Sequence, residues 1–249
     1  MSSDTPGRMT LRVNRVKDGV EARQLLAAGA DVIGFQSNDL ALFELEADPA
    51  WTDGRYVYAA DIPDLMSSVP HAQSIVDLPP DQISPETLQT IVDNGGTVVQ
   101  LSGHNLPPPD VVAMLKEAGL RVVYSGRYLS PGDGPALNRL SGDALPLLDA
   151  LELQVFPSEQ DAFARLQTAA DTGAGEVITP DDLLQLAGRV PLVLGINLNA
   201  QNAGDVARMF AGSALQGLSI TLSPDTHGAF HTLDTDTATS LLPILSEKL

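Results

Sequence analysis

The stretch LRVNRVKDGVEARQLLAAGADVIGF, residues 11–35, decides the fold of this chain. It opens on LRVNRV (11–16) and runs into DVIGFQS (31–37), two apolar segments of strand length. Between them, GVEARQLLAAG (19–29) has helical spacing and ends on a glycine, the usual stop signal of a helix. A strand, a helix and a second strand in so short a segment predict a parallel βαβ unit.

The same alternation continues to the end of the chain. Each further strand candidate is a near-continuous apolar run, as expected when both faces of a parallel strand are buried. We expect strands at 74–79, 97–103, 121–128, 150–157, 191–198 and 217–223. We expect helices at 60–69, 84–94, 108–119, 134–149, 159–171, 179–188, 202–212 and 234–247.

Eight strands with intervening helices in 249 residues predict the α/β class, as a single-domain (β/α)₈ TIM barrel. The main alternative is an open doubly wound sheet, which usually carries a glycine-rich phosphate turn after its first strand. Residues 14–19, NRVKDG, lack that fingerprint. We expect residues 1–10 to form a flexible N-terminal tail and residues 11–249 to form the barrel.

The composition narrows the function classes. The net charge of −18 disfavours binding to nucleic acids and to anionic membrane surfaces. The absence of cysteine excludes disulfides and thiolate chemistry, and no apolar run approaches the roughly 18 residues of a membrane span. His227 and His231 in the last loop match no standard metal-ligand spacing. We therefore expect a cytoplasmic protein without metal or cofactor, either a monomer or a homodimer.

Five motifs, in order along the chain, carry a resemblance to a known family. They are GADVIGF (29–35), DGRYV (53–57), VQLSG (99–103), GAG (173–175) and LGINLNAQN (194–202). Their order resembles that of phosphoribosylanthranilate isomerase, a (β/α)₈ barrel of tryptophan biosynthesis. The resemblance implies an Amadori rearrangement that needs a general acid and a general base.

Several positions depart from the family pattern. Asn14 stands where the family has its Cys base, and an amide cannot abstract a proton. Phe156 and Gln154 lie where the family has its Asp acid. Ile196-Asn197 replaces a Gly-Gly pair at the family's phosphate site, and Pro224 removes an amide donor there. The sequence therefore predicts a diverged member that lacks the catalytic Cys and Asp.

The candidate catalytic residues lie at strand ends, where parallel barrels place their chemistry. Asp77 interrupts the apolar run 74–79, and a carboxylate at the barrel mouth could act as acid or base. An ion pair with a nearby Arg is the alternative for Asp77. His104 is a candidate proton shuttle, or else a solvated loop residue. Asn14 is a candidate for orienting the substrate, or else for bracing a loop.

The candidate substrate-binding residues share the same end of the barrel. The resemblance assigns Arg55 to a substrate carboxylate, which a guanidinium fork suits, and a loop-bracing role is the alternative. The other candidates are Arg15, Gln36, Gln100, Ser102, Tyr124, Gln154, Phe156 and Asn197.

We therefore expect a diverged, phosphoribosylanthranilate-isomerase-like enzyme that needs no cofactor. It would isomerise, cyclise or eliminate a small carboxylate-bearing metabolite, in specialised biosynthesis. Two alternatives stay open. One is the family's own isomerase with a rearranged acid and base, and the other is a non-catalytic binding or assembly protein.

Overall fold

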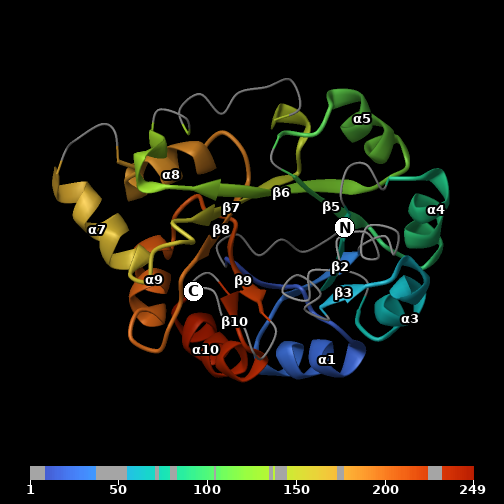
Figure 1. Ribbon diagram of the computed structural model, residues 1–249, viewed down its shortest axis with the longest axis horizontal. Coiled ribbons are helices and arrows are strands. Elements are labelled where there is room, and N and C mark those ends of the chain that lie inside the picture. The colour runs from blue at the N-terminus through green and yellow to red at the C-terminus, as the bar shows by residue number, and fades with distance from the viewer. Residues whose placement is uncertain are drawn as a thin grey trace.

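Parallel strands close into a barrel in the computed structural model (Figure 1). The structure describes residues 9–37, 55–70, 73–78, 83–103, 105–134, 137, 145–172, 177–223 and 232–249. The barrel strands are β1 (Thr10–Asn14), β2 (Val32–Ser37), β4 (Ser74–Leu78), β5 (Val98–Ser102), β6 (Arg121–Leu129), β7 (Ala150–Val155), β8 (Leu192–Ile196) and β9 (Gly217–Leu222). Each pairs with the next in chain order, and β1 pairs with β9 to close the ring. The predicted (β/α)₈ barrel is confirmed.

Two short strands extend the sheet beyond the prediction. Strand β3 (Tyr56–Val57) pairs with β2, and β10 (Thr232–Leu233) pairs with β9. Both pairings are parallel and both lie at the carboxyl ends of the strands they extend. A two-residue strand is too short to show the alternation on which a sequence prediction depends.

Helices surround the strands, as the ribbon in Figure 1 shows. They are α1 (Gly19–Ala28), α3 (Ile62–Ser67), α4 (Pro85–Asp93), α5 (Pro109–Glu117), α7 (Ala162–Thr172), α8 (Pro180–Ala187), α9 (Ala203–Phe210) and α10 (Thr235–Lys248). Local signals set their ends. Asp18 caps α1 by accepting from the amides of Val20 and Glu21, and Gly29 ends it with a left-handed φ of 116°. In the described residues, no helix is both long and apolar enough to cross a membrane.

The helix expected over 134–149 agrees with the structure at Gly134 and Leu137, which are helical, and is wrong at its carboxyl end. Residues Leu145–Leu147 form a short 3₁₀ turn, η5, rather than an α-helix. Pro146 explains the difference, because it lacks the amide that an α-helix interior needs. A second 3₁₀ turn, η4 (Pro131–Asp133), comes before the segment.

The start of α8 provides a local test of helix capping. The Thr179 hydroxyl accepts from the Asp182 amide at 3.2 Å, and the Asp182 carboxylate accepts from the Thr179 amide at 2.9 Å. Replacing Thr179 with Ala breaks this reciprocal pair, so Thr179→Ala should lower the free energy of unfolding by about 1 kcal/mol. Urea unfolding measures this, with the exposed Thr168→Ala as the control, expected within about 0.5 kcal/mol of wild type. Equal midpoints for both variants would contradict the capping account.

Side chains inside the barrel change from apolar to polar along its axis. Near the strand starts, a small apolar cluster fills the interior: Val32, Ile75, Val98, Val123 and Ala150. Further along the same strands the buried interior residues are polar, and they include Arg12, Asn14, Asp77, Gln100 and Glu152. A TIM barrel interior is usually packed with branched apolar side chains, so this polar half marks the candidate site.

Candidate active site

A buried ion pair crosses the barrel interior from β1 to β7. Arg12 Nη1 donates to Glu152 Oε2 at 2.9 Å, and the two side chains are only 6% and 2% exposed. The same nitrogen donates to Gln100 Oε1 on β5 at 3.0 Å. A pair buried this deeply gains little net stability over an apolar pair, because both charges lose their hydration. The pair therefore needs another explanation than stability.

The ion pair belongs to a larger hydrogen-bonded network. Asn14 Nδ2 donates to Glu152 Oε1 at 2.7 Å, and Gln154 Nε2 reaches the same oxygen at 3.3 Å. Gln100 Nε2 donates to Asp77 Oδ2 at 3.1 Å. Gln100 therefore links the carboxyl groups of Asp77 and Glu152, the second through Arg12. The network joins four strands and fixes these side chains relative to one another.

Two glycines make room for the amides of this network. A Cβ on Gly34 would lie 2.6 Å from Asn14 Oδ1, and one on Gly195 would lie 2.1 Å from Gln154 Oε1. Both distances are far below van der Waals contact. The inward positions of β2 and β8 are thus left empty for Asn14 and Gln154.

A cavity of about 90 Å³ opens above the network, at the carboxyl ends of the strands. Its described lining comes from seven of the barrel strands and the residue after β1: Asn14, Arg15, Gln36, Asp77, Gln100, Ser102, Ser125, Tyr128, Glu152, Gln154 and Thr221. Active sites of TIM barrels lie at this end. Nearly every group in the lining can donate or accept a hydrogen bond, so the cavity suits a small polar molecule.

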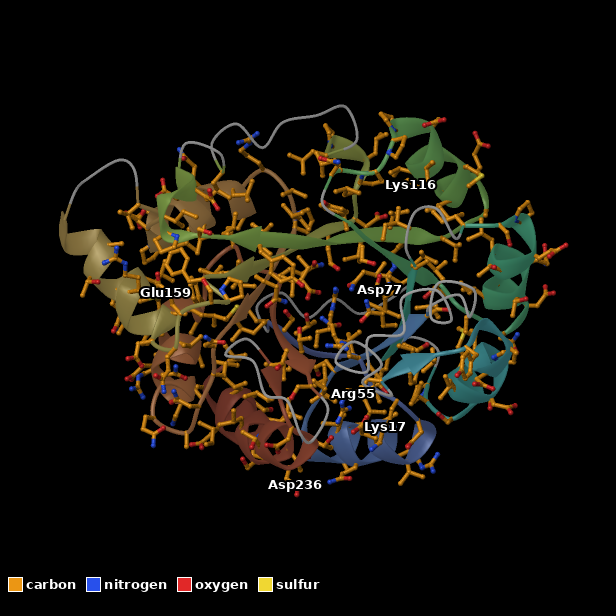
Figure 2. All side chains as sticks on the ribbon, viewed as in Figure 1. Lys17, Arg55, Asp77, Lys116, Glu159 and Asp236 are labelled. Carbon is orange, nitrogen blue, oxygen red and sulfur yellow. The ribbon has the colours of Figure 1, made fainter. Side chains whose placement is uncertain are left out.

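Asp77 is the most perturbed acid of the cavity. Burial raises the pKa of its carboxyl group from 3.8 to about 7, partly offset by the Ser102 hydroxyl and the Gln100 amide. Glu152 raises this pKa further, and Arg12 lowers it. Asp77 Oδ1 has no hydrogen-bond partner among the described residues. Figure 2 shows Asp77 well inside the ring of helices. A carboxyl group with this pKa can give or take a proton near neutral pH.

Two residues with left-handed backbone follow strands at this end of the barrel. Arg15, after β1, has φ 64°, and Phe156, after β7, has φ 51°. Such conformations cost energy in residues other than glycine and concentrate at functional sites. The turn at Arg15 places this residue in the cavity lining.

The cavity gathers seven of the twelve side chains expected at the site: Asn14, Arg15, Gln36, Asp77, Gln100, Ser102 and Gln154. Their common location follows from strand register, because Gln36, Asp77 and Gln100 are partners across β2, β4 and β5. Whether these groups act on a substrate stays a prediction. His104 lies outside the described residues.

Arg55 is placed differently from the expectation. Its side chain is 2% exposed and does not belong to the described lining of the cavity. Nη1 donates to both carboxylate oxygens of Glu21 on α1 at 3.1 Å, Nη2 to the Thr235 hydroxyl at 3.2 Å, and Nε to the Ser223 carbonyl. Figure 2 shows Arg55 on the α1 side of the barrel. These contacts with protein groups favour the loop-bracing alternative, and a carboxylate-binding role for Arg55 stays a prediction.

Three further candidates are also outside the described lining. The Tyr124 hydroxyl donates to the Gly103 carbonyl at 2.6 Å. Phe156 is fully buried in the main apolar core. Asn197 donates its amide to the Glu159 carbonyl. Tyr124 and Asn197 therefore hydrogen-bond protein carbonyls, and a binding role for these three residues stays a prediction.

Arg12 and Glu152 are the functional candidates that the sequence prediction missed. Both sit in apolar runs, LRVN and LELQ, at the alternate position to Asn14 and Gln154. Alternation along a strand puts such residues on one face, so this signal was present in the sequence.

Ser125, Tyr128 and Thr221 complete the lining without having been among the expected site residues. The described residues include no group of three or more His, Asp or Glu side chains that could hold a metal ion.

Comparison with solved structures reveals the same barrel in known enzymes. Phosphoribosylanthranilate isomerase from Thermotoga maritima aligns over 97% of this chain and 100% of its own, with a TM-score of 0.62 and 15% identity. TrpF from Jonesia denitrificans aligns over 96% and 97%, with a TM-score of 0.57 and 18% identity. Tryptophan synthase from M. tuberculosis aligns over 97% of this chain and 92% of its own, with a TM-score of 0.58 and 11% identity. At these identities the likeness shows the fold alone.

Sequence comparisons add no family assignment. No protein-family model matches the chain, and no curated protein matches it significantly.

Proposed function

We propose that this protein is a cofactor-independent, isomerase-like enzyme that moves a proton on a small carboxylate-bearing metabolite. The observation that carries the proposal is Asp77, a buried carboxyl group at the cavity with one oxygen unpartnered among the described residues and a pKa raised to about 7. We propose that the protein descends from the phosphoribosylanthranilate isomerase barrel. Asn14 stands at the position of that family's base, and Phe156 stands at the position of its acid.

The proposed step needs only one proton carrier. The Asp77 carboxylate removes a proton from a carbon next to a carbonyl or a protonated imine, which leaves an enolate or an enamine and a protonated Asp77. The same carboxyl group then returns the proton to the far carbon of a conjugated enolate or enamine, so that no atom or electron is gained or lost. The pKa of about 7 makes both forms of Asp77 available at neutral pH.

The other lining groups suit binding and orientation. Arg15 is the cation that we assign to the substrate carboxylate, because it lines the cavity and its guanidinium can form a two-point contact. We assign Asn14 to a carbonyl or hydroxyl oxygen of the substrate, because its amide nitrogen has a second N–H beside the one that it donates to Glu152. Arg15 is the only cation of the described lining, and in a protein with net charge −18 this favours a small anion over a large polyanion.

Deuterium exchange tests the proposal directly. Wild type is incubated in D₂O with small 2-oxo acids, 3-oxo acids and 1-amino-1-deoxy sugars that carry a carboxylate, and mass spectrometry reads deuterium gain. The rate should fall by roughly 10²–10⁴-fold in Asp77→Asn, because the amide cannot carry the proton. The exposed Asp93→Asn is the matched control and should exchange like wild type. No exchange by wild type, or equal rates in Asp77→Asn, would contradict the proposal and favour a non-catalytic binding protein.

The pH dependence of the same reaction gives a second check. If Asp77 acts first as a base, the second-order rate constant should rise with pH and level off above about 7, because the free enzyme then carries the carboxylate. The rate constants are measured from pH 5 to 9 with the best substrate. A profile with its inflection near pH 4 would assign the base to a carboxyl group with an ordinary pKa.

Glu152 supports a second candidate, the family's own isomerase with a rearranged acid and base. It lies on β7, the strand that carries the family's acid, and it lines the cavity. Turnover of phosphoribosylanthranilate, followed by its loss of fluorescence, tests this candidate, and rescue of a tryptophan auxotroph tests it in cells. Activity in both assays that is lost in Glu152→Gln would establish it.

A further inference from the structure

A second cavity, of about 110 Å³, opens at the opposite end of the barrel. Its place follows from its lining, since Thr10, Val32, Arg121 and Ala150 are each the first residue of a barrel strand. The remaining lining residues are Arg12, Ile75, Val98, Val123, Asp149 and Gln216. The amino-terminal face of a TIM barrel ordinarily serves stability and not chemistry.

The walls of this cavity are small and apolar, whereas its rim is polar. Ala150 and the neighbouring valines leave the space that larger side chains would fill. At the rim, Asp149 accepts from the Val122 amide at 2.7 Å and from Lys116 Nζ at 3.3 Å. A polar rim of this kind keeps an opening wettable.

Arg12 belongs to both ends of the barrel interior. Its Nη1 donates to Glu152 and Gln100 in the polar network, and the side chain also lines the cavity at the amino-terminal end. Its Nε–H has no partner among the described residues, although the side chain is 94% buried. Ser219, the partner of Arg12 across β1 and β9, also has a buried hydroxyl without a partner among them. Two such groups on neighbouring strands are costly to leave unsatisfied.

We propose that ordered water binds Arg12 Nε and Ser219 Oγ and exchanges with solvent through the amino-terminal cavity. A water molecule can accept from the guanidinium N–H and exchange a second hydrogen bond with the hydroxyl. The cavity is large enough for several water molecules. The barrel then has a solvent entrance opposite the candidate substrate cavity. This inference stands on its own and does not rest on the proposed function.

The Arg12 Nε–H proton is a direct probe of this water. In ¹⁵N-labelled wild type, the Nε–H signal is assigned by its loss in Arg12→Lys. The signal should show a cross-peak to water and should exchange with solvent without unfolding of the protein. A signal without a water cross-peak would overturn the proposal.

A substitution that fills the amino-terminal cavity tests whether water reaches Arg12 through it. Ala150→Leu places three more carbons in the opening, so the solvent exchange of Arg12 Nε–H should slow roughly tenfold or more, because exchange then requires local opening of the barrel. Ala113→Leu makes the same change at an exposed position of α5 and should leave the rate unchanged. Exchange as fast in Ala150→Leu as in wild type would mean that water enters elsewhere and would overturn the proposal.

A milder variant covers the case in which Ala150→Leu does not fold. Val98→Ile adds a single methyl group to the same wall and should slow the exchange to a smaller extent. Equal rates in Val98→Ile and wild type would also contradict entry through this end. The readout is independent of catalysis, so its failure would leave the deuterium assay of Asp77 unaffected.

Discussion

Arg55→Met should lower the free energy of unfolding by roughly 3–5 kcal/mol. The change removes the positive partner of Glu21 on α1, whose side chain is only 6% exposed. It also removes the donors to the Ser223 carbonyl and the Thr235 hydroxyl. The guanidinium thus joins α1, the end of β9 and the start of α10, and the substitution leaves the buried Glu21 carboxylate without its cationic partner and the Ser223 carbonyl without this donor. Urea unfolding at pH 7 measures the loss.

A double variant separates the two possible reasons for such a loss. Arg55→Met combined with Glu21→Leu removes both charges, so it should recover most of the stability if the cost is the unpaired carboxylate. Arg208→Met is the control, because Arg208 pairs with Asp205 at the surface, where its side chain is 62% exposed. That control should change stability by less than about 1 kcal/mol. If Arg55→Met instead lost substrate binding with unchanged stability, the carboxylate-binding role expected from the resemblance would be restored.

Sequence patterns predicted the barrel because each of its signals is local. Near-continuous apolar runs, helical spacing and the Gly29 stop depend on neighbours within one or two turns. The error at residues 145–147 has the same origin, since Pro146 interrupts an otherwise helical pattern. The short strands β3 and β10 were unpredictable because partners distant in sequence alone create them.

The site was harder to predict than the fold, because the role of each polar side chain depends on which groups surround it in the folded protein. Position at a strand end correctly placed Asn14, Asp77 and Gln100 around one cavity. Arg55 was assigned by resemblance, and nothing in its neighbouring sequence indicates that Glu21 occupies its guanidinium. Arg12 and Glu152 were missed although alternation along β1 and β7 places them on the same face as Asn14 and Gln154.

Asp77 should make the stability of this protein depend on pH. Its pKa is about 7 in the folded protein and 3.8 as the reference for the unfolded chain, so the folded state binds the proton more tightly. The resulting stabilisation is complete below about pH 4 and is lost as the pH rises through 7. A difference of about three pKa units corresponds to about 4 kcal/mol. The free energy of unfolding should therefore fall across this range because of Asp77 alone.

Asp77→Asn isolates this contribution, because the amide resembles the neutral acid and never becomes charged. The remaining carboxyl groups titrate in both proteins and cancel in the difference between them. Urea unfolding from pH 4 to pH 8 should show wild type losing about 4 kcal/mol relative to Asp77→Asn, so that the variant becomes the more stable protein at pH 8. Asp93→Asn should follow wild type at every pH. A difference that stays constant with pH would give Asp77 an ordinary pKa and would remove the basis for its role as the proton carrier. A difference that titrates near pH 7 would instead show that a buried carboxyl group is kept at a cost in stability, as expected for a group retained for function.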